Sequence, residues 1–392
     1  MGAGRSDIES DADFSARPLA AGRICASAPA PGVKPDHGVP GLIEIELKFQ
    51  VPAAARHAVQ AEVKAHAGAA CTRLQARYVD TPEQHLARAR AALRLRREGP
   101  VWVQTLKAQG VDLLQRLEHN APVDPADGDP PALRLARHAG TPALPALARA
   151  LGCTDDAMNE AARTDNTLGL GVVFETNIRR DHAPLTVAPG STVVELAFDD
   201  GEIRGGGRAQ AVCELEMELL QGDVAGLLTT AADWVQRHGL WLDVRSKAER
   251  GNLLAQGLQA SPPQLPPAAI AGQPGHEAVS ACLHAALRNA AVVAAGLADF
   301  HSDLATGQAA APVAEPQAHT QALVAGLGRL HSLLSRHAAE SGLAESLILW
   351  LAPLDVAGAA QTRAAGRLVR SAAFNQWVLG VLGWCAAQRP SA

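Results

Sequence analysis

Apolar and charged residues alternate in several short segments of the first two thirds of the chain. Segment 43–49 reads IEIELKF, with Glu44, Glu46 and Lys48 at every second position. Successive side chains of a β-strand point to opposite faces, so the three charged groups share one face while the apolar residues face a core. The same alternation returns in VWVQTLKA, STVVELAFDDGEI and AVCELEMELL. The pattern predicts a largely antiparallel sheet over residues 42–255.

Helical periodicity interrupts these strands and then replaces them. Apolar residues recur at three- and four-residue spacing at 53–67, at 224–239 and throughout 277–392, which predicts connecting helices and a small all-α bundle at the end. The Pro-rich stretch SPPQLPPAAIAGQPG predicts a linker over 256–276. Residues 1–41 have no period, and we expect a flexible extension there.

The signs of the alternating charges segregate by strand. Acidic residues dominate at 44–46, 195–199 and 214–218, whereas basic residues dominate at 94–96 and at 107. Glutamates in a row on one face repel one another unless cations lie between them. We therefore favour about eight strands that close into a barrel with a wet, charged lumen. An ordinary sheet with one solvated face is the alternative.

A lumen of this kind suits a polyanion that carries a divalent cation. Carboxylate oxygens are hard ligands for Mg²⁺ or Mn²⁺, and arginine and lysine bind phosphate oxygens. A triphosphate fits this description best, because phosphoryl transfer needs mainly positioning and charge neutralisation. A second metal or a lysine of lowered pKa would prepare water for attack, and Lys48 and Lys107 are the candidate catalytic lysines.

The order of the motifs resembles the CYTH superfamily, the triphosphate tunnel metalloenzymes. EIELKF is similar to the E-x-E-x-K opening of that family, and RYVDTPEQHLARARAALRLR to its Y-x-D-T-P … L-R-x-R segment. The family order then continues with QTLK, QRLEHNAPV, FETNIRRDHAPL, ELAFDDGEI, CELEMELLQGD and RSKAERG. The likeness is greatest to bacterial inorganic triphosphatases with a downstream CHAD domain. These cleave tripolyphosphate to pyrophosphate and phosphate with Mg²⁺ or Mn²⁺.

The resemblance implies an α+β fold, in which an eight-stranded antiparallel β-barrel with flanking helices precedes a small all-α helical bundle. It also implies two sets of site residues. The acids that would hold the metal are Glu44, Glu46, Asp199, Glu214 and Glu216. The cations that would bind phosphate oxygens are Lys48, Arg94, Arg96, Lys107, Arg180, Lys247 and Arg250. Two further acids, Glu118 and Glu195, are either tunnel residues or salt-bridge partners.

Two other classes of function stay open. One is an organic triphosphate enzyme, such as thiamine triphosphatase, nucleoside triphosphatase or class IV adenylyl cyclase. The other is a non-catalytic module that binds polyphosphate. Tyr78 and Trp102 are the only large rings in the early strands, which favours an inorganic substrate over one with a base to stack. The many carboxylates disfavour a simple anion binder.

Composition limits the partners and the compartment. The net charge of −5 over 392 residues argues against a general nucleic-acid binder. We find no run of about 18 apolar residues and expect no membrane span. The six cysteines are dispersed without a C-x-x-C pair, so we predict free thiols and a cytoplasmic protein.

The helical tail differs from a complete CHAD domain. It keeps His319 and Arg329 where that family has a histidine followed by arginines, but residues 277–392 carry seven Arg against seven Asp and Glu. CHAD domains are associated with polyphosphate binding through a strongly basic surface, which this balance does not supply. We expect a shortened CHAD-like bundle with a structural or docking role. A weak polyphosphate contact through the tail and a homodimer are left open.

Overall fold

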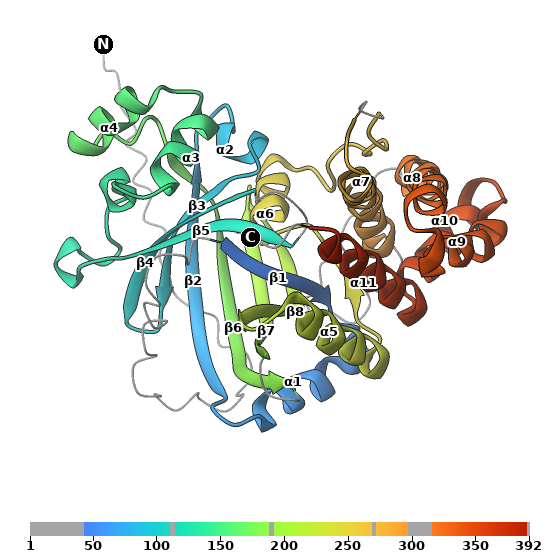
Figure 1. The fold of residues 1–392 in the computed structure, drawn as a ribbon. Coiled ribbons are helices and arrows are strands. Elements are labelled where there is room, and N and C mark those ends of the chain that lie inside the picture. Colours follow the sequence, from blue (N-terminus) through green and yellow to red (C-terminus); the bar gives the residue numbers. More distant parts are fainter. Residues whose placement is uncertain (1–42, 110–113, 188–191, 269–271, 297–315, 390–392) are drawn as a thin grey trace, which may run out of the picture.

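Eight antiparallel strands close into a barrel. The computed structural model describes residues 43–109, 114–187, 192–268, 272–296 and 316–389, so the expected extension at 1–41 lies outside the described residues. The strands follow the order β5-β4-β3-β2-β6-β7-β8-β1, and pairing of β1 with β5 closes the barrel (Figure 1). The predicted α+β fold with an eight-stranded barrel is confirmed.

The strands differ in length. The barrel strands are β1 (Ile43–Gln50), β2 (Ala70–Asp80), β3 (Ala92–Glu98), β4 (Val101–Gln109), β5 (Gln115–Pro122), β6 (Gly171–Val187), β7 (Thr192–Gly205) and β8 (Arg208–Gln221). A ninth strand, β9 (Trp241–Leu242), pairs with the end of β1. The β7–β8 hairpin turns at Gly206 and Gly207, whose φ angles of 56° and 73° suit glycine in a two-residue turn.

Helices cover the outside of the barrel. They are α1 (Arg56–Ala65), α2 (His85–Arg88), α3 (Ala143–Leu151), α4 (Asp155–Arg163), α5 (Val224–His238) and α6 (Lys247–Gln256), with short 3-10 turns at Ala53–Ala55, Pro125–Asp127 and Leu135–His138. The alternate apolar residues of the strands face these helices: Phe49, Leu196 and Phe198 are fully buried in a core with α1 and α5. Since the apolar face packs outward, the charged face lines the lumen.

The C-terminal region is entirely helical in its described residues. It consists of α7 (Gly275–Ala295), α8 (Pro316–His337), α9 (Leu343–Leu351), α10 (Gly358–Arg370) and α11 (Ala372–Ala387), with 3-10 turns at Ala339–Ser341 and Ala352–Leu354. Figure 1 shows these helices as a layer beside the barrel, next to α5 and α6. Their core is continuous with that of the barrel, because Trp234 of α5 shares one buried cluster with Val279 and Phe374.

Two further expectations concern the cysteines and the membrane. Cys153, Cys213, Cys282 and Cys385 are free, as predicted. Cys71 is disulfide-bonded, so the free-thiol prediction is wrong for this residue; spacing along the sequence does not show which thiols meet in space. Among the described residues, α7 is the one helix long and apolar enough to cross a membrane, and 61% of its apolar window is buried inside the fold, as in a core helix.

Candidate active site in the barrel lumen

Strand register places the predicted charges on one face. Glu46, Lys48 and Gln50 of β1 lie opposite glutamates of β8. Asp199 of β7 lies between Glu214 of β8 and Arg180 of β6 in the sheet order. Paired residues of neighbouring strands point to the same side of a sheet. The closed barrel therefore brings together, in its lumen, acids and bases that lie on separate strands of the sequence.

One group of charges, the Lys247 cluster, consists of Lys247 with Arg180, Arg250, Asp199, Glu214 and Glu216. Nζ of Lys247 lies 2.6 Å from Oδ2 of Asp199 and 2.8 Å from Oε1 of Glu216, and it also pairs with Glu214. Arg180 donates two hydrogen bonds of 2.7 Å to Asp199 and pairs with Glu216, while Arg250 pairs with Glu214. Three carboxylates thus face three cations.

The charged state of this cluster is well defined. Burial alone would raise the pKa of Asp199 and Glu216, but Arg180 and Lys247 outweigh it and hold both pKa values below their usual range. The same carboxylates raise the pKa of Lys247 although burial opposes this. All three groups are ionised at neutral pH, so the cluster is a compact set of buried ion pairs.

A second group, the Lys107 cluster, consists of Lys107 and Arg116 with Glu44, Glu46 and Glu118. Nζ of Lys107 lies 2.6 Å from Glu44, 3.0 Å from Glu118 and 3.8 Å from Glu46, and Arg116 lies 2.9 Å from Glu46. Here three carboxylates share two cations. Burial and the charge of Glu46 raise the pKa of Glu44 well above its usual value, so one carboxyl of this cluster holds a proton more readily than the others.

Three other predicted cations have partners outside these clusters. Lys48 is 6% exposed and its ammonium donates to the backbone carbonyl of Arg245. Burial lowers the pKa of Lys48 to about 8, although Glu214 and an aspartate raise it. Arg94 donates to the hydroxyl of Tyr78 at 2.9 Å, and Arg96 pairs with Glu98.

Several residues that lie in the lumen or contact its side chains were missed as site residues. Gln50 donates to Oε2 of Glu214 at 3.4 Å and to Oδ2 of Asp243 at 3.2 Å. Gln50 and Arg116 continue the alternation of their strands, so the period-two pattern contains the signal for both. Asp243 and Arg245 follow a two-residue strand, where no alternation exists to indicate their place.

Some residues of the family motifs stabilise the fold and do not line the lumen. Both carboxylate oxygens of Asp80 accept backbone N–H groups at the start of α2, from Thr81 at 2.8 Å and from Leu86 and Ala87 at 2.9 Å. A Cβ at Gly251 would lie 2.2 Å from the ring of Phe174, so glycine is required for the packing of α6 on β6.

Within the described residues, one group of three acids meets the geometric requirement for a cation site. Ligand oxygens of Asp199, Glu214 and Glu216 lie within 4.8 Å of one another. Hard carboxylate oxygens suit Mg²⁺ or Mn²⁺. Glu44 and Glu46, which were predicted to share the metal, lie instead around Lys107. The lumen thus combines one group of acids that could hold a cation with the cations predicted to bind phosphate.

Comparison with solved structures gives several distant similarities. A candidate adenylyl cyclase from Hippeastrum, described as having a dominant triphosphatase activity, is 16% identical over 55% of this chain and 96% of its own, with a TM-score of 0.36. A candidate adenylate cyclase from Bacillus halodurans is 15% identical over 49% of this chain and 88% of its own, with a TM-score of 0.33. A Pyrococcus horikoshii protein is 17% identical over 53% and 98%, with a TM-score of 0.31.

The family comparison covers the barrel and the helices that pack on it. The CYTH domain matches residues 42–251, which is more than half of the chain and includes every strand described above. Together with a closed eight-stranded barrel whose lumen is lined by segregated charges, this match shows that the chain belongs to the CYTH family.

Proposed function

We propose that the protein is an inorganic triphosphatase that cleaves tripolyphosphate to pyrophosphate and phosphate with Mg²⁺ or Mn²⁺. The observation that carries the proposal is the Lys247 cluster, in which every carboxylate of the cation site is paired with a cation of the phosphate-binding set. A metal–triphosphate complex would give both the carboxylates and the cations of this cluster new partners. The carboxylates would take the metal and the cations would take the phosphate oxygens, so no charge is left unpaired.

Two groups of acids would bind two divalent cations. Asp199, Glu214 and Glu216 would hold the first divalent cation, which supplies neutralisation of the phosphate charge and polarisation of the phosphorus. Glu44 and Glu46 would serve a second cation, and the excess of carboxylates over cations in their cluster supports this role.

The cations would hold and orient the substrate. Arg180, Lys247 and Arg250 would bind oxygens of the phosphate nearest the metal, while Arg94, Arg96 and Lys107 would bind the others from β3 and β4. Stabilisation of the developing charge on these oxygens is the main requirement of phosphoryl transfer.

Lys48 is the better placed of the two candidate catalytic lysines. Lys107 contacts three carboxylates, which hold its ammonium charged and in place. The ammonium of Lys48 donates instead to a neutral backbone carbonyl. A neutral acceptor stabilises the ammonium less than a carboxylate does, so Lys48 can more easily give up a proton and take one from the attacking water.

The aromatic residues support an inorganic substrate. Tyr78 stacks on Phe174 with ring centroids 4.4 Å apart at 15°, and the two residues are 5% and 3% exposed. Both faces of this pair are therefore engaged in the protein core and offer no platform for an adenine or a thiazolium ring. Trp102 donates to Asp129 at 3.1 Å in an exposed contact of β4.

We further propose that residues 42–255 form the catalytic domain and that 277–392 are a shortened CHAD-like accessory bundle joined by the segment 256–276. His319, the residue that most resembles a CHAD position, is 5% exposed and contacts Oδ1 of Asn289 through Nδ1 at 3.1 Å. This burial supports a structural role for the bundle. A cytoplasmic location is consistent with the proposal.

The test is phosphate release from tripolyphosphate, ATP and thiamine triphosphate, each with Mg²⁺, Mn²⁺ or a chelator. We expect fast, metal-dependent cleavage of tripolyphosphate that the Glu214→Gln/Glu216→Gln variant loses. Glu160→Gln, on the exposed face of α4, is the matched control and should keep full activity. Faster turnover of an organic substrate would contradict the inorganic specificity. Tight tripolyphosphate binding without hydrolysis would contradict catalysis itself.

A further inference from the structure

The segment Trp241–Arg245 lies between the lumen and the helical region. On the lumen side it is hydrogen-bonded to β1: the N–H of Asp243 donates to the carbonyl of Lys48 at 3.0 Å, and the ammonium of Lys48 donates to the carbonyl of Arg245. Gln50 reaches the carboxylate of Asp243 from the same strand. The position of Lys48 thus depends on where this segment is held.

An internal ion pair fixes the end of the segment. Oδ1 of Asp243 accepts from the backbone N–H of Arg245 at 2.9 Å and from its Nε at 3.0 Å, and Oδ2 accepts from Nη2 at 2.8 Å. The two side chains are 1% and 9% exposed. Because three hydrogen bonds hold Arg245 to Asp243, the carbonyl that receives Lys48 has one orientation.

The helical region holds the other side of the segment. Oδ1 of Asn375, on α11, accepts from the N–H of Leu242 at 2.8 Å, and its Nδ2 donates to the carbonyls of Val369 and Ser371 at 2.9 and 2.8 Å. Asn375 is 2% exposed, and the hydrogen bonds of its amide connect β9 to the α10–α11 junction.

A second contact comes from the end of α10. The guanidinium of Arg370 lies over the ring of Trp241, 4.8 Å from its centroid, and donates to the carbonyl of Ala294 on α7 at 2.6 Å. A buried cation–π contact of this kind contributes attraction beyond packing. Arg370 therefore joins β9 to α7 as well as to α10.

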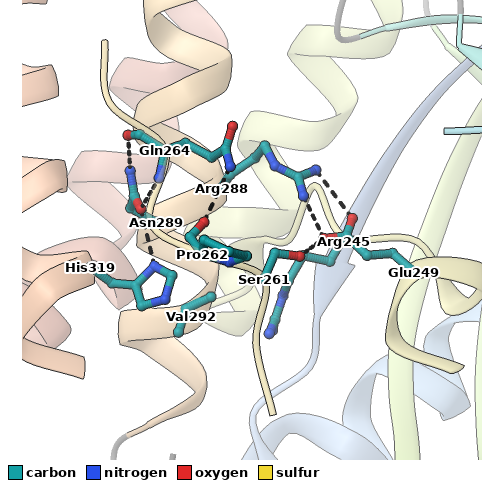
Figure 2. Close-up of a pocket in the computed structure, with 9 residues that line it drawn as sticks. All are labelled: Arg245, Glu249, Ser261, Pro262, Gln264, Arg288, Asn289, Val292 and His319. Atoms are coloured by element: carbon teal, nitrogen blue, oxygen red, sulfur yellow. Dashed lines mark hydrogen bonds and ion pairs between the residues drawn. The ribbon is translucent and has the colours of Figure 1, made fainter. Parts of the chain in front are cut away.

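Arg245 itself is enclosed by the helices. It lines a small cavity of about 10 Å³, room for about one water molecule, together with His319, Asn289 and the Arg288–Glu249 pair. Figure 2 shows Gln264, Asn289 and His319 in one chain of hydrogen bonds on one side of this cavity and Arg288 against Glu249 on the other. The wall around Arg245 thus comes from α6, α7, α8 and the segment before α7.

We propose that the helical region is part of the catalytic apparatus because it positions Lys48 through the segment Trp241–Arg245. Asn375 and Arg370 hold β9 from outside, and Asp243 and Arg245 transmit that placement to the ammonium of Lys48. These are positioning residues, and none of them touches the substrate. The inference rests on the proposed function, in which Lys48 is a lumen residue of the triphosphatase site, and it is carried by the hydrogen bonds between Lys48 and this segment.

A double-mutant cycle in the full chain tests this. We expect Asn375→Ala to lower kcat for tripolyphosphate about tenfold, about 1.4 kcal/mol in activation free energy, with KM nearly unchanged. In a Lys48→Ala background the same change should cost less than about twofold, because residues that act through one group are not additive. Arg245→Met should behave as Asn375→Ala does, and Arg245→Lys should recover most of the loss. Gln376→Ala, the next residue on α11, is the matched control.

The outcomes separate the inference from the proposed function. Equal losses from Asn375→Ala with and without Lys48 would overturn the positioning role and leave only a contribution to stability. Unchanged kcat in Asn375→Ala and Arg245→Met, with folding shown by circular dichroism, would also overturn it. If the wild type hydrolyses no triphosphate, or the Lys48→Ala background is too slow to measure, the same cycle is read on tripolyphosphate affinity by calorimetry. Coupling there supports the inference, and additivity contradicts it.

Discussion

The Lys247 and Lys107 clusters face the same lumen but differ in charge balance. The Lys247 cluster sets three carboxylates against Arg180, Lys247 and Arg250, whereas the Lys107 cluster sets three carboxylates against two cations. The Lys107 cluster therefore has one cation fewer to offset the cost of burying its carboxylates. In the Lys247 cluster, Arg180 and Lys247 hold the pKa values of Asp199 and Glu216 below their usual range. In the Lys107 cluster, burial and the charge of Glu46 raise the pKa of Glu44 well above its usual value.

The difference shows what each cluster can do without a ligand. In the Lys247 cluster, the cations stabilise the carboxylates, and under the proposed function a metal–phosphate complex would replace both sets of partners. In the Lys107 cluster, three carboxylates share two cations, and burial together with the charge of Glu46 makes Glu44 hold a proton more readily than its neighbours. Buried carboxylates are retained as charges only where something positive compensates them. We therefore propose as metal ligands the carboxylate oxygens of Asp199, Glu214 and Glu216, which lie within 4.8 Å of one another.

The largest expected effect is on turnover. Glu216→Gln should lower kcat/KM for tripolyphosphate by about 10² to 10³, the usual cost of removing a preorganised charge from a phosphoryl-transfer site. Glu44→Gln should lower it less than about tenfold, because its carboxyl is less ionised. The measurement is phosphate release at saturating Mn²⁺. Equal losses in the two variants would contradict the difference between the clusters.

The same two variants should change the free energy of unfolding in opposite directions. Without metal, Glu216→Gln leaves Arg180 and Lys247 short of a partner and should lower stability by about 1–3 kcal/mol. Glu44→Gln removes a surplus carboxyl and should raise stability by up to about 1 kcal/mol. Urea titration in chelator measures both. Destabilisation by Glu44→Gln as large as that by Glu216→Gln would show that the Lys107 cluster is also balanced.

The pH dependence of stability should distinguish the clusters in the same way. The pKa of Glu216 is lowered in the folded state, so its contribution is present above the ordinary value of 4.5 and is lost as the pH falls through the folded pKa. The pKa of Glu44 is raised, so its contribution is present below 4.5 and is lost as the pH rises through the folded pKa.

Comparison of each variant with the wild type in chelator isolates these contributions. The stability difference between the wild type and Glu216→Gln should grow with pH up to about 4.5 and then level off. The stability difference between the wild type and Glu44→Gln should instead fall as the pH rises above about 4.5. Its slope should be at most about 1.4 kcal/mol per pH unit, the value for one proton. Parallel curves for the two variants would contradict the assignment of opposite shifts.

Much of the barrel could be predicted from the sequence because alternation and strand register are local properties. Once Glu44, Glu46 and Lys48 occupy every second position, closure of the sheet places them in the lumen. What alternation does not contain is which strand lies beside which. The sequence therefore groups Glu44 and Glu46 with Glu214 and Glu216 as acids, and the structure separates them around Lys107 and Lys247.

The connection between the helical tail and the lumen could not be predicted for a different reason. The Pro-rich composition at 256–276 predicts a linker between independent parts, yet Gln264 within it is hydrogen-bonded to Asn289 of α7. Asp243 and Arg245 contact β1, and Asn375 contacts β9, across more than a hundred residues of sequence. No periodicity indicates such contacts.

The most direct test of the account is the position of manganese in a crystal of the protein soaked with Mn²⁺ and a non-hydrolysable triphosphate. We predict an anomalous peak bound to oxygens of Asp199, Glu214 and Glu216, with Lys247 and Arg180 moved from these carboxylates to the phosphates. A single peak held by Glu44, Glu46 and Glu118, with the Lys247 cluster still paired as it is here, would contradict it.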